Sequence, residues 1–548
     1  MVNKKYNYLL FLIVLIIIVT GSLFLIKKET NNYSLNESNI NNVLFRDRVS
    51  KFAREVAESY FDKKIIQYPK ELKVESNWGL SVTLYHNGKI KGQGLGKNKK
   101  LYLALEEATK SALNGFNKED LKEAKFLIRF LSSSYNFSFI ESNGQEKELI
   151  ADIVPIRNLD KNLIIQKIKE GKEFLYKMEN PVEHGFYKEY DVLNDKFENR
   201  LYTVYSSSIV YTFLYVYDLE KDSDILKNIS DWGNFILSMQ DKDKNGESFG
   251  AFHYSYYLDT KEKENRFVVG TSALSIFTLL RLYDLTGDLK YLDSAKLAGD
   301  WLTTMQKTNG SMNSYLLKDS NGLTKDSKES LLYNGQVLSA LSKLYGVTKE
   351  RKYYNTAKAI AEYFAEKYEQ ASGFVDDDYR KKDPISNSWI VMSLKDFYKV
   401  EFNESDKNKY KKIIFELSEK VLKNQENDPK DILNYGTWIG VNSSSGTGWI
   451  DEVMAEMYKF CKEENREDCD KYKDAVVKAI RWIIQNTYSA DNSFFIEKPE
   501  KAIGGIFWSQ NNKYVRNDSV CHALNGYVII MSYLNDGVLL SIPEEITN

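Results

Sequence analysis

Pairs of helix-length segments repeat along this 548-residue chain from about Lys161 to Asn535. Two of these pairs are nearly the same, because the segment Thr286–Lys296 is echoed by Thr348–Lys358. The period is about 60 residues, which is the length of one helical hairpin with its loops. We therefore expect six helical hairpins to pack side by side and close into a ring around a central cleft.

The two helices of each expected hairpin carry different patterns. Apolar residues recur every three or four positions in the first helix, as in Tyr291, Ala295 and Ala298, which is typical of an outer helix with one wet face. The second helix follows a loop and begins with small or polar residues. We expect it inside the ring, where small residues let six helices converge and polar residues cap the first amides. These starts lie at residues 206–208, 270–272, 334–336, 386–388, 446–448 and 517–519.

The N-terminus carries an almost unbroken apolar run from Tyr8 to Ile26, with lysines on both sides. At 1.5 Å per residue, a helix over this run just crosses a bilayer that is about 30 Å thick. We expect residues 1–28 to be an uncleaved signal anchor and transmembrane helix that leaves the bulk of the chain outside the cytoplasm, in the cell envelope. A cleaved signal peptide is the alternative. Residues 29–42 are polar and low in complexity, as a tether is.

Residues 43–156 predict a small α+β domain. Alternating apolar residues from Leu80 to Leu84, a turn near Gly88 and a glycine-rich return strand predict a β-hairpin with helices before and after it. The run Gly79–Gly96 resembles the strand and turn of the AMMECR1-like domain. The cysteine that this family usually carries after the turn glycine is absent here, with Gln93 near that place. The resemblance therefore implies a scaffold or spacer role without thiol chemistry.

Composition excludes several classes of function. Lysine and arginine number 75 against 77 aspartates and glutamates, which leaves no basic stripe, so we expect no nucleic-acid partner. No phosphate-binding loop, dinucleotide fingerprint or zinc pattern occurs, and we expect no cofactor and no metal. Asp241, Asp243 and Asn245 imitate the opening of a calcium loop, but Phe252 stands where an EF-hand needs glutamate, so an irregular calcium site is the remaining alternative.

Three cysteines occur, and two of them bracket a short charged stretch. Cys461 and Cys469 stand on either side of what reads as the turn between two helices. A disulfide there could staple the turn in an oxidising compartment, and the sequence leaves the pairing open.

Six hairpins in this order resemble the (α/α)6 toroid superfamily, which includes six-hairpin glycosidases, sugar epimerases, polysaccharide lyases and terpenoid-cyclase-like proteins. The resemblance covers residues 157–548 and rests on architecture. It implies a substrate cleft over the loops that lead into the inner helices. These loops join glycines to aromatic residues or carboxylates, which suits a sugar, because its C–H faces stack on aromatic rings and its hydroxyls form hydrogen bonds. We expect six aromatic residues to bind substrate: Phe252, Trp389, Trp438, Trp449, Phe507 and Trp508.

Two chemistries compete for the catalytic residues. A glycosidase needs two carboxylates that flank one bond. The candidates for this role are Glu329, Asp376, Asp377, Asp378, Asp383 and Asp518. A lyase or an epimerase needs a base, commonly His or Tyr, and a cation that holds the substrate carboxylate. The candidates for that role are His253 with Tyr254, and Arg516 with His522.

Structural roles are the alternatives for several of these residues: a helix cap for Asp518, a packed histidine for His522 and a solvated turn for the three successive aspartates. Two function classes follow. The first is a membrane-anchored, extracytoplasmic, carbohydrate-active enzyme, either a hydrolase or a uronate lyase or epimerase, with a glycan or polysaccharide as its partner. The second is a non-catalytic toroid that binds glycan or protein in the envelope.

Overall fold

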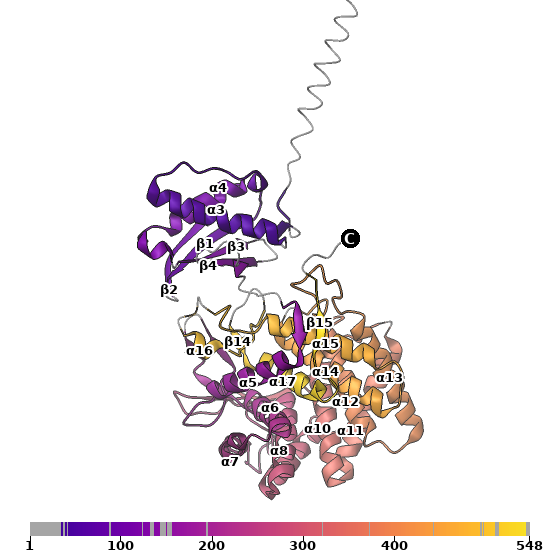
Figure 1. The fold of residues 1–548 in the computed structure, drawn as a ribbon. Helices are drawn as coiled ribbons and strands as arrows, with labels where there is room; N and C mark the ends of the chain where they lie inside the picture. Colours follow the sequence, from indigo (N-terminus) through magenta and orange to yellow (C-terminus); the bar gives the residue numbers. More distant parts are fainter. Residues whose placement is uncertain are drawn as a thin grey trace, which may run out of the picture. The chain divides into compact units, whose positions relative to one another are not determined.

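The computed structural model describes residues 34–543, except for residues 37–38, 41, 87–88, 123, 132–135, 143–148, 151–155, 193–194, 320–321, 372, 442, 494–495, 497 and 510–513. The chain divides into two compact units, with the division between Asp152 and Ile153 (Figure 1). No helix of the described part is long and apolar enough to cross a membrane. The expected anchor, Tyr8–Ile26, lies outside the described residues.

The first unit is an antiparallel sheet with two helices packed on it. The sheet order is β2-β1-β3-β4-β5, and α3 and α4 also contact each other. The predicted hairpin is confirmed, because β1 pairs with β2 from Leu80 and Gly96 to His86 and Lys89. The elements are α3 (Val43–Asp62), η1 (Lys70–Leu72), β1 (Gly79–His86), β2 (Lys89–Gly96), α4 (Leu101–Ala112), η2 (Glu119–Lys122), β3 (Lys125–Leu131), β4 (Asn136–Ser142) and β5 (Leu149–Ile150).

The glycines of β2 let α4 approach the sheet at backbone distance. A Cβ atom on Gly94 would lie 2.0 Å from the carbonyl oxygen of Ala108. In the same way, Gly92 meets Ala112, one turn after Ala108, and Gly96 meets Ala104, one turn before it. Every second residue of β2 therefore faces every fourth residue of α4, and at each of these contacts a glycine lies against an alanine. The resemblance to the AMMECR1-like domain stays a prediction.

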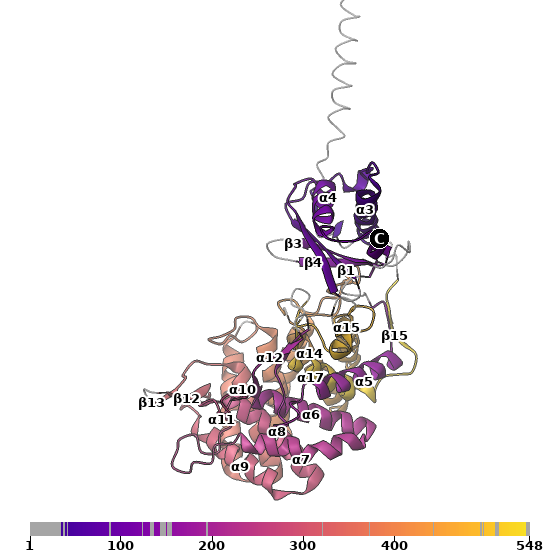
Figure 2. The same cartoon turned by 90° about the vertical axis from the view of Figure 1, so that its left-hand side faces the viewer.

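The second unit is a ring of six helical hairpins, each with an outer and an inner helix. Figure 2 shows α7 and α9 on the outer side of α8. The outer helices are α5 (Lys161–Lys177), α7 (Ser223–Ser238), α9 (Leu289–Thr304), α11 (Arg351–Gln370), α13 (Glu404–Leu422) and α15 (Asp470–Gln485). The inner helices are α6 (Thr203–Glu220), α8 (Val269–Thr286), α10 (Leu331–Thr348), α12 (Pro384–Tyr398), α14 (Ser444–Glu463) and α17 (Asn517–Met531).

The inner helices close on themselves. Each one packs against the next, and α17 returns to pack against α6 and α5. Two pairs of short strands join the ends of the ring, β15 (Val538–Ser541) with β6 (Asn158–Asp160) and β14 (Val515–Arg516) with β7 (Glu189–Asp191). The predicted toroid is thereby confirmed. The other short elements are β8 (Lys196–Phe197), β9 (Arg200–Tyr202), β10 (Ser255–Tyr257), β11 (Arg266–Val268), β12 (Tyr315–Asp319), β13 (Gly322–Lys325) and α16 (Pro499–Ala502).

Four of the six loops that lead from an outer to an inner helix pack on the next outer helix through a glycine that meets its backbone. Gly436 has a φ of +102°, and a Cβ atom there would lie 2.1 Å from the carbonyl oxygen of Lys478 in α15. Gly504 repeats this arrangement against Glu170 of α5, so the sixth loop meets the first hairpin. Gly250 and Gly310 do the same in the second and third loops. Glycine is required because the left-handed backbone and the close approach both exclude a side chain.

A glutamine at the end of the outer helix completes this junction. The Gln425 amide donates to the carbonyl oxygens of Gly436 (3.1 Å) and of Ala475 in the next outer helix (2.8 Å). Gln240 and Gln306 repeat the arrangement. Each glutamine thus satisfies the carbonyl group of its own loop and that of the neighbouring hairpin.

The disulfide that the sequence left open is present. Cys461 and Cys469 are bonded between α14 and α15, and Cys521 is free and buried.

The polar residues near the inner-helix starts do more than cap amides. Ser272 and Asn334 lie one turn inside their helices and accept backbone N–H groups of the preceding loops, from Phe252 (3.1 Å) and Met312 (3.0 Å).

The glycine junction gives a first prediction. We expect Gly436→Ala to lower the melting temperature of the ring by several degrees, because the new methyl group meets the Lys478 carbonyl. Gly440→Ala is the matched control, since Gly440 is in the same loop with a φ of +83° and has nothing within 4 Å of its Cβ position. Equal melting temperatures for the two variants would show that the contact with α15 does not matter.

Candidate active site

A pocket of about 850 Å³ opens between the six inner helices. All six contribute, because an inner helix is buried by its neighbours on its other sides and leaves only one face for the axis of the ring. The lining positions follow the helical spacing of three and four residues. On α14 they include Ser445, Trp449, Glu452 and Glu456, and on α17 they include Asp518, His522 and Asn525.

Arg516 and Asp518 form an ion pair at the start of α17. Arg516 Nη2 lies 2.6 Å from Asp518 Oδ2, and Nε lies 3.2 Å from Oδ1. Tyr205 accepts a further Nη2–H bond at 2.7 Å, and Ser445 donates its hydroxyl to Asp518 at 3.0 Å. The indole of Trp508 lies 4.0 Å from the guanidinium carbon. This arrangement fixes both charges at the pocket wall.

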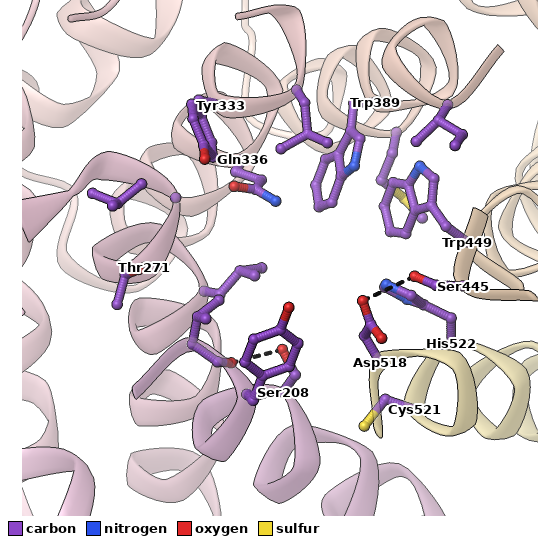
Figure 3. A pocket seen from close by; sticks show the side chains of 18 of the residues that line it. Ser208, Thr271, Tyr333, Gln336, Trp389, Ser445, Trp449, Asp518, Cys521 and His522 are labelled. Carbon is purple, nitrogen blue, oxygen red and sulfur yellow. Dashed lines mark hydrogen bonds between the residues drawn. The ribbon is translucent and has the colours of Figure 1, made fainter. Parts of the chain in front are cut away.

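His522 and Glu452 form a second pair, which joins α17 to α14. Nδ1 of His522 lies 2.8 Å from Oε2 of Glu452, and the Asn525 amide donates to Oε1 at 3.2 Å. An ionised carboxylate only accepts hydrogen bonds, so Nδ1 donates to it, and in the neutral imidazole Nε2 is then the nitrogen with the free lone pair. Figure 3 shows His522 and Asp518 pointing into the same cavity. The His522–Glu452 pair therefore has the geometry of an oriented general base.

Two indoles form the wall beside His522. Trp389 and Trp449 stack with their centroids 3.8 Å apart, and the His522 ring meets Trp449 edge-on at 5.2 Å. Both indoles are buried in the described protein but line the cavity (Figure 3). They provide a flat apolar surface next to the imidazole, of the kind that the C–H face of a sugar can contact.

Several buried polar atoms of the pocket lack a hydrogen-bond partner within the described protein. They are Thr271 Oγ1, Gln336 Oε1, Trp449 Nε1 and Asn525 Oδ1. Buried polar groups are almost always hydrogen-bonded in proteins. The pocket wall thus offers donors and acceptors for a ligand that is rich in hydroxyl groups.

Four charged residues form the deep end of the pocket. Lys343 pairs with Asp396 at 3.0 Å, and Lys395 pairs with Glu456. Burial raises the pKa of Glu456, but the charge of Lys395 outweighs burial and lowers this pKa to about 2. Burial likewise lowers the pKa of Lys343, and the charge of Asp396 raises it above its usual value. The deep charges neutralise one another.

Seven of the thirteen expected site residues line this pocket. They are Tyr254, Trp389, Trp449, Trp508, Arg516, Asp518 and His522. Asp518 is not the helix cap that the sequence suggested as an alternative, because the N-cap position is Arg516.

Three expected substrate-binding aromatic residues are core residues instead. Phe252 and Phe507 are fully buried and Trp438 is 1% exposed. Phe252 and Trp438 form isolated β-bridges with Gln240 and Gln425 at the ends of the outer helices, and Phe507 bridges to Val515. They fill the seams at the hairpin junctions, so the expectation for these three was wrong.

Three expected catalytic residues also lie outside the pocket. His253 Nδ1 bonds to the Glu264 carbonyl at 2.9 Å, and burial lowers the pKa of this imidazole. The carboxylate of Glu329 bonds to Tyr363 and, at 2.8 Å, to Lys367. Asp377 is 3% exposed and accepts N–H groups from Leu331, Tyr379 and Arg380. Each of these groups already has structural partners.

The neighbours of Asp377 are also capping residues. Asp376 accepts the Lys382 N–H group, Asp378 accepts that of Glu329, and Asp383 caps α12. In the loop that resembles a calcium site, Asp241 accepts from Asp243 N and from the Ser248 hydroxyl. Among the described residues, no group of three or more His, Cys, Asp or Glu side chains could hold a metal ion.

The sequence analysis missed Tyr205, Arg266, Gln336 and Glu452, all of which line the pocket. Glu452 and Gln336 lie within inner helices, away from the glycine-rich loops that suggest a sugar site in the sequence. The spacing of three residues between Trp449 and Glu452, which puts both on one face of a helix, was the signal for Glu452.

Comparison with known proteins supports the fold. The family model Glycosyl hydrolase family 76 matches residues 270–417, a minority of the chain, from α8 into α13. No match was found among curated proteins. Among solved structures, cellobiose 2-epimerase from Bacillus thermoamylovorans B4167 has 13% sequence identity and a TM-score of 0.53, and the match covers 68% of this chain and 99% of that one.

Two further structures have the same arrangement of helices. A sugar epimerase from a ruminal bacterium has 13% identity and a TM-score of 0.50, over 69% of this chain and 99% of its own. A D-mannose isomerase has 13% identity and a TM-score of 0.50, over 68% and 98%. The ring therefore shares the (α/α)6 toroid fold of these structures.

Asp377 gives a second prediction. We expect Asp377→Ala to destabilise the ring by about 2 kcal/mol or more, because three backbone N–H groups lose a charged acceptor. Asp376→Ala is the control, since Asp376 is exposed and accepts one N–H group. Thermal unfolding and a binding titration measure the effects. Loss of glycan binding at an unchanged melting temperature would contradict this prediction and indicate that Asp377 contacts the substrate.

Proposed function

We propose that the ring is a carbohydrate-active enzyme that binds one end of a glycan in the axial pocket and moves a proton with the His522–Glu452 pair. The observation that carries this proposal is the orientation of His522. Its Nδ1 is held by Glu452 at 2.8 Å, and its ring lies beside Trp449, where a sugar can rest. The unpartnered polar atoms of the same pocket match a ligand with many hydroxyl groups.

Proton transfer at a carbon is the reaction that this geometry supports best. Nε2 of His522 takes the proton from a sugar carbon next to a carbonyl or carboxyl group, and Glu452 stabilises the imidazolium that forms. The electron pair moves onto the carbonyl oxygen, where a fixed cation such as Arg516 stabilises the negative charge. Return of the proton to the opposite face of that carbon gives an epimer, and its delivery to the former carbonyl carbon gives an isomer. Departure of a leaving group from the carbon on the other side of the deprotonated carbon gives an unsaturated sugar.

Hydrolysis is the second candidate, and the match to Glycosyl hydrolase family 76 favours it. Glu452 and Asp518 would then be the two carboxylates that a glycosidase needs. Asp518 pairs with Arg516 at 2.6 Å, and Glu452 pairs with His522 at 2.8 Å.

These roles give a third prediction. We expect His522→Ala to lower turnover about a hundredfold or more at an unchanged melting temperature, because a general base is lost and the core is intact. The assay incubates the protein with neutral and uronic-acid glycans in deuterated water. Deuterium at a sugar carbon indicates an epimerase or isomerase, and an unsaturated sugar, seen by its ultraviolet absorbance, indicates a lyase. New reducing ends with neither signal indicate a hydrolase, and Asp518→Asn should then abolish them.

The chain offers a matched control. His184 Nδ1 lies 2.9 Å from Glu179 Oε1, which copies the His522–Glu452 geometry outside the pocket. His184→Gln should leave turnover unchanged. Glycan binding that needs Trp449 but shows no turnover would contradict the enzyme and favour the non-catalytic toroid.

For location, we propose that Tyr8–Ile26 anchors the chain in the membrane and that both folded units lie outside the cytoplasm. The length of the apolar run and the flanking lysines support this anchor. The Cys461–Cys469 disulfide supports an oxidising compartment, since such bonds rarely persist in the cytosol.

Cell fractionation tests this topology as a fourth prediction. In intact cells whose outer layers admit protease, we expect the ring to be digested, and mass spectrometry of the membrane fraction should recover the segment Tyr8–Ile26 on the mature chain. A cytoplasmic protein of the same cells is the control and should survive. Protection of the ring until lysis, or a mature chain that begins after Ile26, would contradict the proposal.

A further inference from the structure

The cations of the pocket differ in whether a carboxylate neutralises them. Lys343 and Lys395 pair with Asp396 and Glu456, and Arg516 pairs with Asp518. Arg380, at the mouth, pairs with Asp383 at 3.1 Å. Arg266 also lines the pocket, and no carboxylate of the described protein lies within ion-pair distance of its guanidinium.

The position of Arg266 is fixed by packing instead. Arg266 begins β11, which pairs with β12, and its backbone carbonyl accepts the Tyr254 N–H group at 2.9 Å. Its guanidinium lies 5.1 Å from the Tyr254 ring and 5.0 Å from the Tyr315 ring. Both tyrosines line the pocket. Stacking on aromatic faces orients a guanidinium but leaves its in-plane N–H groups for another acceptor.

Neutral polar groups lie close to this arginine. Burial raises the pKa of Tyr333, whereas the nearby charges of Arg266 and Arg380 act to lower it, so these groups share one region. Gln336 is only 7% exposed, its Oε1 has no partner within the described protein, and Figure 3 shows its side chain directed at the cavity. A Cβ atom on Gly270 would lie 2.2 Å from that oxygen, so the glycine makes room for the amide.

We propose that Arg266 binds an anionic substituent of the glycan, a carboxylate or an ester oxyanion on the sugar ring, while Gln336 bonds to a neighbouring hydroxyl. The inference rests on the proposed function and adds its substrate class, an acidic sugar. A planar guanidinium matches a carboxylate with two parallel hydrogen bonds. The amide of Gln336 can donate and accept, as recognition of a hydroxyl group requires.

The other charged side chains near Arg266, Asp326 and Lys328, do not neutralise the charge of its guanidinium. Asp326 lines the pocket too, but its carboxylate accepts the Tyr379 hydroxyl at 2.5 Å and the Lys328 backbone N–H group at 3.2 Å. Lys328 is exposed, and its ammonium lies over the Tyr379 ring at 5.8 Å. Lys328 therefore adds positive potential at the mouth, which draws an anionic sugar toward Arg266.

The test is a calorimetric titration of the full-length protein with matched ligands, which also serves as the fifth prediction. The probes are trisaccharides of glucuronate, galacturonate and mannuronate, each beside its methyl ester, and glucose 6-sulfate beside glucose. We expect at least one charged probe to bind about tenfold or more tightly than its neutral partner, with a preference that falls at high salt. We expect Arg266→Gln to abolish this preference and to leave the affinity for the neutral partner nearly unchanged.

Arg281→Gln is the matched control, because Arg281 pairs with Asp218 and does not line the pocket. It should keep the preference for charge. A preference that is limited to uronates identifies a carboxylate, and one that is limited to the sulfate identifies an ester. Equal affinity for charged and neutral probes, no binding of any charged probe, or a preference that survives Arg266→Gln would each overturn the inference. Turnover of neutral glycans that depends on His522 would leave the proposed function standing in those cases.

Discussion

The ring depends on the contact between a loop glycine and the backbone of the next outer helix. Gly436 and Gly504 each approach a carbonyl group of the neighbouring hairpin so closely that no side chain fits between them. The same junction occurs in four of the six hairpins and holds their loops at one end of the helices. The inner helices then begin together, and their first turns form the mouth of the pocket.

Closure also decides where charge can lie. Around the axis, each inner helix faces five others, and a charged side chain there loses most of its water. Ion pairs offset this loss of hydration, as between Lys343 and Asp396 and between Lys395 and Glu456 at the deep end. Nearer the mouth, pairing serves orientation as well, since Glu452 fixes the His522 ring. Arg266 differs from these because aromatic rings hold it in place of a carboxylate.

The loops explain why only about half of the expected site residues line the pocket. A glycine next to an aromatic residue predicts a sugar-binding surface, but the same pattern also occurs at the hairpin junctions, where the aromatic residue is part of the core. Phe507 fills such a seam, while Trp508, the next residue, lines the pocket. Burial cannot be assigned to one of two adjacent aromatic residues without the packing around them. The same holds for Asp377, since a buried capping carboxylate and a catalytic carboxylate look alike in sequence.

The sequence by itself determined the number of hairpins, their order and the glycine-rich strand of the small domain, because these follow from local periodicity and from residues without side chains. It also placed Arg516, Asp518 and His522 together, since they are neighbours in the chain. The tertiary structure alone decided that Glu452, Gln336 and Arg266 share their pocket. These residues come from different hairpins, and only closure of the ring turns one face of each inner helix toward a common axis.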